Sequence, residues 1–191
     1  MSLLSMGAGE PRSLTGPPGA ESALFTPDGQ SILVQAREAE KRAIHRVDFG
    51  TGSSTPVFEV EGPVVGSRRG APWAISPDGA RLAIQDVDGA VSAWPLSGGA
   101  ASPLIRLIAH EKLLRWDRAD SLLVGALDRR TGFVDRVNLS TGARTRLHEI
   151  NMLDEAGVLF DPFLVVSQDG RAYAYSSSRF LNSLYLVSGL R

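Results

Sequence analysis

The stretch "ISPDGARLAIQDVDGAVSAWPLSGGA", residues 75–100, contains two turn motifs, each followed by a short apolar run. In the first turn, Ser76-Pro77-Asp78-Gly79, proline presets φ at a central position and glycine supplies the left-handed residue of a bulged hairpin loop. Asp88-Gly89 forms the second turn. We therefore expect a meander with one strand ending near residue 75, and further strands over 80–85, 90–96 and within 100–108.

The same hairpin pattern occurs four times along the chain. Its copies span residues 23–36, 72–86, 113–126 and 163–176. Three of the copies have an Asp-Gly turn: Asp28-Gly29, Asp78-Gly79 and Asp169-Gly170. The third copy has Arg118-Ala119-Asp120 at this place, so we expect its turn to be the least regular.

A second motif follows each hairpin and sets the length of the repeat. Residues 43–53, 90–100 and 133–143 align without gaps, and 183–191 is a truncated fourth copy. Their closing glycines are separated by 47, 43 and 47 residues: Gly52, Gly99, Gly142 and Gly189. This period matches a four-stranded propeller blade of about 40–50 residues. The sequence therefore predicts an all-β protein, a β-propeller of about four four-stranded antiparallel blades that is part of a larger propeller.

The expected units are an N-terminal segment and four repeats. The repeats cover approximately residues 22–70, 71–110, 111–160 and 161–191. In the N-terminal segment 1–21, residues 12–15 resemble the outer strand of a blade that could complete the sheet ending near Leu190. Residues 37–42, "REAEKR", are good helix formers, but their place between two strands favours a long solvated loop. An irregular connection is expected over 148–162.

Composition excludes several classes of partner and chemistry. Lys and Arg number 20 and Asp and Glu 21, so the net charge of -1 provides no field to attract nucleic acid or an anionic membrane. Cysteine is absent, which rules out disulfides and thiolate sites and leaves the compartment open. The apolar runs are too short for a signal-peptide core or a membrane span, so no membrane insertion of this chain is expected.

The turns Thr26-Pro27-Asp28-Gly29 and Ser76-Pro77-Asp78-Gly79, with the strand ends at 47–52 and 137–142, resemble TolB-like and WD-repeat-like bacterial β-propellers. This resemblance runs from about residue 22 to the end and implies binding rather than chemistry. Residues 173–191 resemble the closing segment of propellers that follow a serine/threonine kinase in some bacterial receptor-like proteins. That likeness implies the C-terminal sensor part of a larger signalling protein, although the sequence has no kinase motif.

Two arginine pairs are the candidate ligand-contacting residues: Arg68 with Arg69, and Arg129 with Arg130. Paired guanidinium groups can hold a carboxylate or phosphate through bidentate hydrogen bonds, although such pairs are more often solvated loop charges. Trp73, Trp94 and Trp116 are expected to pack between blades rather than to bind a ligand.

No catalytic residue, cofactor or metal ion is expected. The three histidines are far apart and lack metal-ligand spacing, and the sequence has neither a G-x-S-x-G motif nor a phosphate-binding loop. Residues 86–89, "DVDG", lack the distal ligands of a calcium loop and are interpreted as a hairpin turn.

The sequence thus favours a non-enzymatic interaction module that binds a protein, peptide or other ligand at its loops. An alternative is the substrate-gating propeller of a prolyl-oligopeptidase-like hydrolase whose catalytic domain lies outside this chain, and a purely structural role is a third. A ring closed by four blades predicts a monomer. An incomplete ring, which we favour, exposes apolar faces and predicts a homodimer through its open edges.

Overall fold

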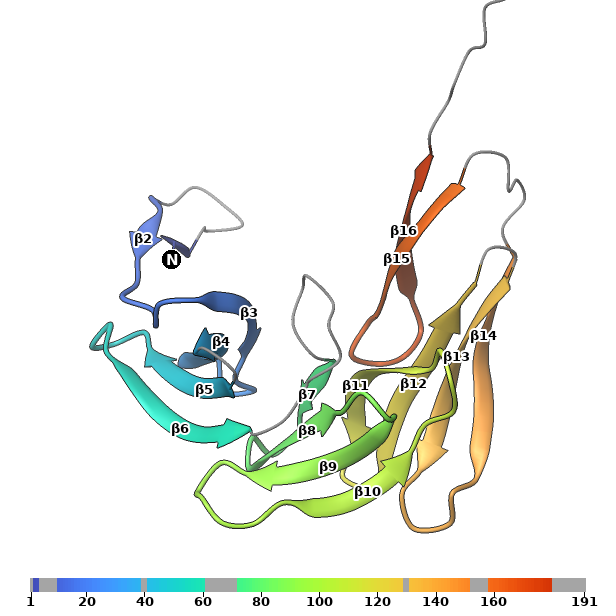
Figure 1. Cartoon of the computed structure of the whole chain (residues 1–191), viewed down its shortest axis with the longest axis horizontal. Helices are drawn as coiled ribbons and strands as arrows, with labels where there is room; N and C mark the ends of the chain where they lie inside the picture. Colours follow the sequence, from blue (N-terminus) through green and yellow to red (C-terminus); the bar gives the residue numbers. More distant parts are fainter. Residues whose placement is uncertain are drawn as a thin grey trace, which may run out of the picture.

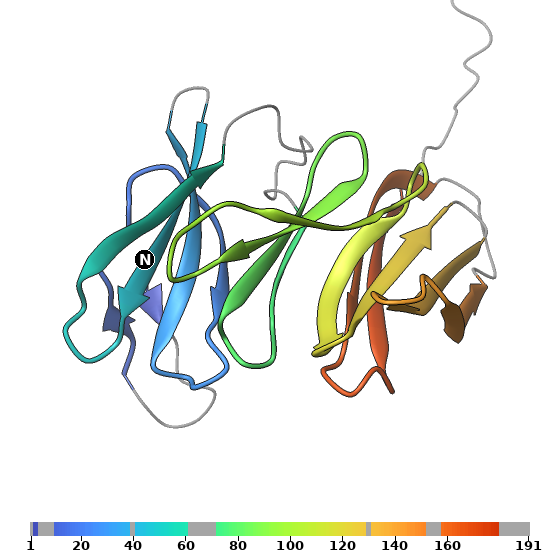
Figure 2. The ribbon, with the colours of Figure 1, turned by 90° about the horizontal axis from the view of Figure 1, so that it is seen from below.

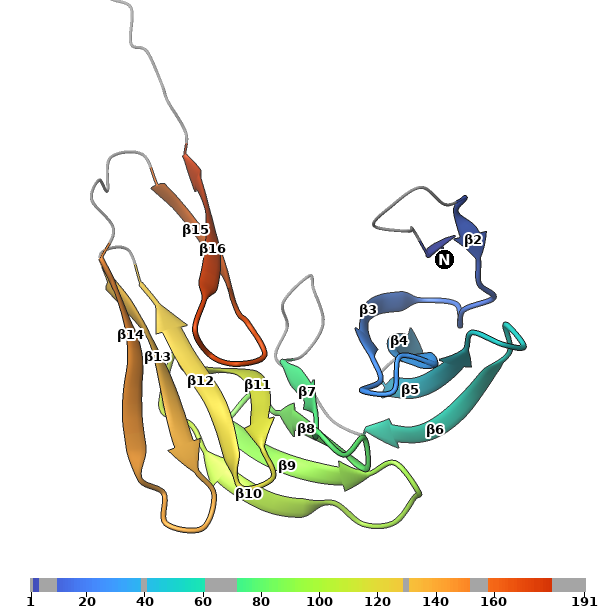
Figure 3. The same ribbon diagram turned by 180° about the vertical axis from the view of Figure 1, so that it is seen from behind.

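The computed structural model describes residues 2–3, 10–38, 41–60, 72–128, 131–151 and 158–179, and all regular elements in these ranges are β-strands. Figure 1 shows the strands grouped into successive sheets around an open arc. Seen from behind, the arc has the same opening between the first and the last sheet (Figure 3). The chain is therefore a β-propeller, as the repeats predicted.

Three sheets are complete four-stranded antiparallel blades, each ordered as in the sequence. Blade one contains β3 (Ala20–Phe25), β4 (Ser31–Glu38), β5 (Lys41–Asp48) and β6 (Ser54–Val60). Blade two contains β7 (Trp73–Ile75), β8 (Arg81–Gln85), β9 (Ala90–Pro95) and β10 (Ser102–Arg106). Blade three contains β11 (Lys112–Arg118), β12 (Ser121–Leu127), β13 (Thr131–Asn138) and β14 (Arg144–Asn151).

Two further pairs of strands lie at the ends of the arc. The last hairpin joins β15 (Val158–Val166) to β16 (Tyr173–Arg179), and a short N-terminal ribbon pairs β1 (Ser2–Leu3) with β2 (Arg12–Ser13). Residue Leu190 lies outside the described residues, so the expected closure of a C-terminal sheet by residues 12–15 stays a prediction.

The repeated turns share one geometry. Gly29, Gly79 and Gly170 have φ values of 67°, 69° and 71°. In the second copy Asp78 Oδ1 accepts hydrogen bonds from Ser76 Oγ at 2.5 Å and from the Ala80 amide at 3.0 Å. Asp28 and Asp169 accept the equivalent bonds.

The third copy departs from this geometry. Arg118 pairs directly with Ser121 across a two-residue turn, next to a register shift between Trp116 and Arg118. None of its residues has a positive φ. The loss of proline and glycine in the sequence therefore coincides with a shorter turn and a bulged strand.

Apolar residues pack mainly between the sheets. One cluster joins blade one to blade two and includes Leu33, Ile44, Trp73 and Leu82, and another joins blade two to blade three. In a third cluster, the last hairpin packs against blade three. Trp73 is 8% exposed and Trp116 is 2% exposed in these junctions, which confirms that both tryptophans pack between blades.

One expectation about local structure was wrong, and another is confirmed only in part. Residues 37–42 do not form a long loop, because Arg37 pairs with Arg42 and Glu38 with Lys41 as the β4–β5 ladder extends. There, helix propensity is overridden by backbone pairing. The irregular connection expected over 148–162 is confirmed in part: β14 continues to Asn151 and β15 begins at Val158, but the register of β15 shifts between Leu159 and Phe163. Residues 152–157 lie outside the described residues.

Because neighbouring strands of a blade are antiparallel, its loops lie alternately at two opposite ends. Short turns such as 26–30, 49–53, 76–80 and 167–172 lie at one end, here called the turn end, and Figure 2 shows turns 26–30 and 167–172 on the same side. The other end, here called the connection end, carries the 86–89 turn and the 107–111 connection from blade two to blade three.

Gly89 and Gly29 provide a matched test of this backbone. Both have positive φ, 80° and 67°, so alanine should cost about 1–2 kcal/mol at each. A Cβ at Gly89 would lie 2.5 Å from the Leu107 carbonyl oxygen, whereas nothing lies within 4 Å of one at Gly29. We expect Gly89→Ala to cost at least about 1 kcal/mol more, or about 2–4 °C in melting temperature. Equal losses for the two variants would contradict this packing.

Candidate functional site

The four predicted arginines, Arg68, Arg69, Arg129 and Arg130, lie outside the described residues. The strands on either side of them are described. Val60 and Pro72 border the first gap. Asp128, whose amide donates to the Thr131 carbonyl oxygen at 2.8 Å, borders the second. All these flanking residues lie at the connection end. Ligand contact by the arginines stays a prediction.

At this end, the 107–111 connection has buried ends and an exposed middle. Leu107 and Glu111 are buried, whereas Ile108 is 69% exposed and Ala109 and His110 are also exposed. The Leu107 amide donates to the Gly89 carbonyl oxygen at 2.8 Å, and the Glu111 amide donates to that of Ile108 at 3.1 Å. The connection is therefore fixed while it presents an apolar side chain to solvent.

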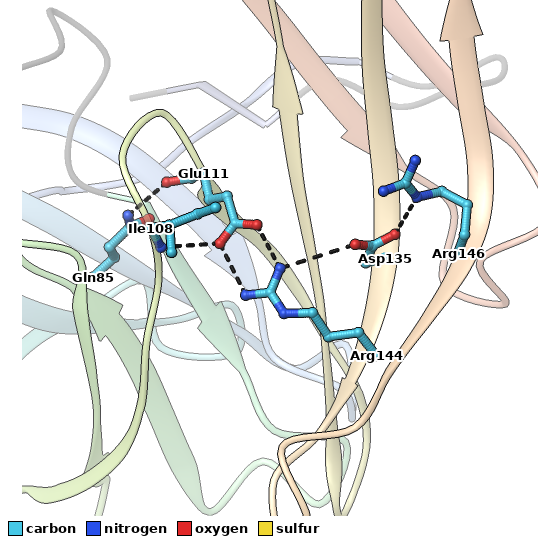
Figure 4. Close-up of polar contacts among 6 residues, drawn as sticks. All are labelled: Gln85, Ile108, Glu111, Asp135, Arg144 and Arg146. Carbon is cyan, nitrogen blue, oxygen red and sulfur yellow. Dashed lines mark hydrogen bonds and ion pairs between the residues drawn. The ribbon is translucent and has the colours of Figure 1, made fainter.

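Glu111 anchors this connection to blade three (Figure 4). Its carboxylate, with only 2% of the side chain exposed, accepts two hydrogen bonds from Arg144, at 2.5 and 3.0 Å. A third comes from the Ile108 amide at 3.1 Å. Burial acts to raise the pKa of Glu111, but the Arg144 and Ile108 hydrogen bonds and the Arg144 charge together hold it below the ordinary value of 4.5.

Gln85 holds the backbone on the other side of Glu111. Its Nε2 donates to the Glu111 carbonyl oxygen at 2.8 Å, and its Oε1 accepts from the Leu113 amide at 2.8 Å. Gln85 ends β8 of blade two and is 5% exposed. The bidentate contact thus joins the second blade to the first strand of the third.

A second buried carboxylate extends the network. Asp135 of β13, whose side chain is 7% exposed, accepts a short hydrogen bond from Arg146 and lies 3.9 Å from Arg144 Nη1. The Arg146 guanidinium also lies over the Phe133 ring, 4.4 Å from its centroid. Arg144 therefore lies between two carboxylates, which raises its pKa, mainly through the Glu111 hydrogen bond.

His110 has an unusual backbone conformation for its residue type. Its φ is 72°, and no other non-glycine residue in the described ranges has a positive φ. A left-handed non-glycine residue costs about 1–3 kcal/mol and persists where its surroundings impose it, often at binding sites. Here the hydrogen bonds of Glu111 and Leu107 on either side impose it.

Val87 adds a second exposed apolar side chain beside this connection. It is 48% exposed in the 86–89 turn, and Arg106 Nη1 donates to the Asp88 carbonyl oxygen of that turn at 3.0 Å. Asp86 Oδ1 accepts from the Asp88 and Ala90 amides at 2.9 and 2.8 Å, which confirms the hairpin-turn interpretation of this segment. We call Val87, Ile108 and His110 the connection patch.

Sequence reasoning missed the connection patch. An isoleucine after an apolar strand is normally a core residue, and only the bond between Leu107 and Gly89, with the anchored Glu111, turns residue 108 outward. In the part of the chain that is described, no three or more His, Cys, Asp or Glu residues gather as a metal site would require. That same part contains no helix with the length and apolarity needed to cross a bilayer.

Comparisons with known proteins identify the fold. No family model matches the sequence, and no curated protein matches it. Among solved structures, TolB from Acinetobacter baumannii aligns with a TM-score of 0.64 at 16% identity over 91% of this chain and 42% of TolB. A chain of a nidogen/laminin complex aligns with a TM-score of 0.55 at 15% identity, over 82% of this chain and 60% of that one.

An enzyme is also among the structural neighbours. The isopeptidase AtxE2 aligns with a TM-score of 0.51 at 13% identity, over 87% of this chain and 37% of the isopeptidase. These similarities show a TolB-like β-propeller fold, and this chain spans less than half the length of TolB. Because one of these neighbours is named as an isopeptidase, the fold alone does not assign or exclude an activity.

The Glu111–Arg144 pair should contribute more to the free energy of unfolding near neutral pH than at acidic pH. Arg144→Ala would leave a buried carboxylate without its cation, and we expect a loss of about 2–3 kcal/mol, reduced from the fully buried range because Arg144 is 34% exposed. Arg171→Ala is the control, since Arg171 is 88% exposed and 3.9 Å from Asp169. It should cost less than about 1 kcal/mol.

The pH dependence of this loss follows from the lowered pKa of Glu111. The stabilisation is complete above the unfolded pKa, near 4.5, and disappears as the pH falls through the lower folded pKa. Urea unfolding at pH 7 and at pH values below 4.5 should therefore show the Arg144→Ala deficit shrink on acidification. A deficit that is constant with pH would contradict an ionised Glu111 as its cause.

Proposed function

We propose that this propeller is a non-enzymatic module that binds a protein or peptide partner at its connection end. The observation that carries the proposal is the connection patch, in which Val87 and Ile108 are 48% and 69% exposed on segments fixed by internal hydrogen bonds. Exposed apolar side chains on a preorganised backbone favour binding, because little conformational entropy remains to be lost.

The polar groups of the turn end offer less to a partner. Its polar side chains bond to their own turns: the carboxylates of Asp28, Asp78 and Asp169 each accept from a hydroxyl and an amide two residues away. Asp48 and Asn138 similarly accept from the residues that follow them. These groups serve the turns, so recognition is assigned to the opposite end.

The predicted arginines suit a binding role by their chemistry. The segments that contain Arg68, Arg69, Arg129 and Arg130 begin and end at strand termini of the connection end. Guanidinium groups can hold a carboxylate through bidentate hydrogen bonds, which would complement an apolar contact. An acidic or carboxylate-bearing peptide with an apolar anchor fits this combination.

One structural neighbour belongs to a nidogen/laminin complex, which is compatible with a protein-binding role for the fold. A place at the C-terminal end of a larger kinase-type signalling protein stays a prediction from sequence. The hydrolase-gating alternative, in which the catalytic domain lies outside this chain, also stays a prediction from sequence.

A peptide library displayed on phage and selected on the immobilised protein tests the proposal. Selected peptides should bind the Ile108→Asp and Val87→Asp variants at least about tenfold more weakly than the wild type, because a carboxylate would replace the apolar anchor site. Gln168→Asp is the control, since Gln168 is exposed at the turn end, and it should leave affinity unchanged.

Two results would overturn the proposal. Selected peptides that bind Ile108→Asp and Val87→Asp as tightly as the wild type would place recognition elsewhere. Cleavage of the peptides by the purified chain, seen by mass spectrometry, would show that the module is an enzyme.

A further inference from the structure

The outer strands of the three blades differ in how they end their sheets. β6, β10 and β14 are each the last strand of a blade, and in the described ranges no strand pairs with their other edge. β6 contains Pro56 and β10 contains Pro103, and a proline has no amide hydrogen to donate to a further strand. β14 runs for eight residues, Arg144–Asn151, without a proline. Its edge therefore offers a complete set of backbone donors and acceptors.

This edge lies at the outside of the arc. Figures 1 and 3 show β14 as the outermost strand of blade three, with no described strand beyond it. In the chain the strand lies between β13 and β15, so its open edge does not depend on where the chain begins or ends. An exposed edge of this length is a template for pairing with another strand.

Two charged side chains of β14 lie on the same face of blade three. Arg146 is opposite Asp135 of β13, and Glu149 is opposite Phe133. Asp135 and Phe133 are two residues apart on one strand, so they face the same side of the sheet, as do the residues opposite them. The position of the Arg146 guanidinium over the Phe133 ring agrees with this.

A bulge in β14 produces this arrangement. In a regular strand, residues three apart such as Arg146 and Glu149 point to opposite faces. The register of β14 shifts at Leu147, which is an extra residue beside His148. Both of these side chains point towards the last hairpin, since Leu147 packs in its cluster and His148 Nε2 lies 2.7 Å from a carbonyl oxygen of its turn. The extra residue changes the alternation of the side chains that follow it.

The bulge makes β14 complementary to itself in the antiparallel direction. With a two-fold axis between Leu147 and His148, Arg146 of each copy lies opposite Glu149 of the other. A symmetric antiparallel pair requires these two residues to lie on one face of the strand, and the bulge meets that requirement. Opposite charges that face each other across two strands stabilise the pairing.

Both charges are placed to reach a second strand. The Arg146 side chain is 49% exposed, and Glu149 is also exposed. Arg146 donates to Asp135 through Nε, so its two terminal nitrogens can donate to an opposing carboxylate. The buried Asp135 therefore holds the guanidinium in position for a partner.

We propose that two copies of this chain pair through their β14 strands, antiparallel around a two-fold axis between Leu147 and His148. The two copies of blade three then form one continuous sheet, with an Arg146–Glu149 ion pair on each side of the axis. Such a contact uses the same surface of both copies and closes on itself. This surface contains no residue of the connection patch. It also differs from the terminal faces of an incomplete ring, whose association stays a prediction from sequence.

Light scattering over a hundredfold dilution measures the association. The wild type should have a mass near twice the 20.4 kDa of one chain, falling towards 20.4 kDa on dilution. Glu149→Arg should be monomeric over the same range, because two arginines would face each other on each side of the axis. Far-UV circular dichroism and melting curves show whether this variant is folded. Glu59→Arg is the matched control, since Glu59 is exposed on the proline-containing β6, and it should dimerise like the wild type.

Amide hydrogen exchange locates the contact. In the dimer the outward amides of β14 donate to the second copy, so in the wild type they should exchange more slowly at high protein concentration than at low concentration. In Glu149→Arg their exchange should be independent of concentration, as should that of β6 and β10 in the wild type.

Three results would overturn the proposal. The first is a wild-type mass of 20.4 kDa at all concentrations. The second is a folded Glu149→Arg variant that dimerises as strongly as the wild type. The third is a wild-type dimer in which the β14 amides exchange as fast as in the dilute protein, which would place the contact on another surface.

Discussion

Apolar packing between neighbouring blades is the interaction on which the rest of the structure depends. A blade of four short strands has two large faces, and both must be buried for the sheet to be stable. In β8 the consecutive residues Leu82, Ala83 and Ile84 are 0–5% exposed, because alternate side chains enter clusters with blade one and blade three. Each blade therefore stabilises the next.

The same constraint explains the buried charges between blades two and three. The chain must return from the outer strand β10 to the inner strand β11, and this return brings Glu111 into the junction. A buried carboxylate is tolerable only when it is paired and hydrogen-bonded, and Arg144, the Ile108 amide and Gln85 meet that requirement around it. The rigid connection that presents Ile108 and His110 follows from this pairing, so the junction and the proposed binding surface are one structural unit.

The sequence predicted features that repeat and missed features that occur once. Asp78-Gly79 and its relatives could be recognised because the turn needs a left-handed glycine and a carboxylate that bonds its own backbone. Residues 37–42 could not be placed, since helix propensity was overridden by the β4–β5 ladder. The connection patch could not be predicted either, because it depends on a contact between Glu111 and Arg144, which are 33 residues apart. The arginine pairs remain candidates from sequence alone.

Urea unfolding followed by two probes tests most directly whether the blades depend on one another. Trp73 and Trp116 lie buried in the two junctions, so their fluorescence reports junction packing, while far-UV circular dichroism reports the sheets. If inter-blade packing holds the fold together, both signals should change in one transition with the same midpoint. A fluorescence change that is complete at lower urea than the loss of strand signal would show that the blades are stable without their junctions, and would contradict this dependence.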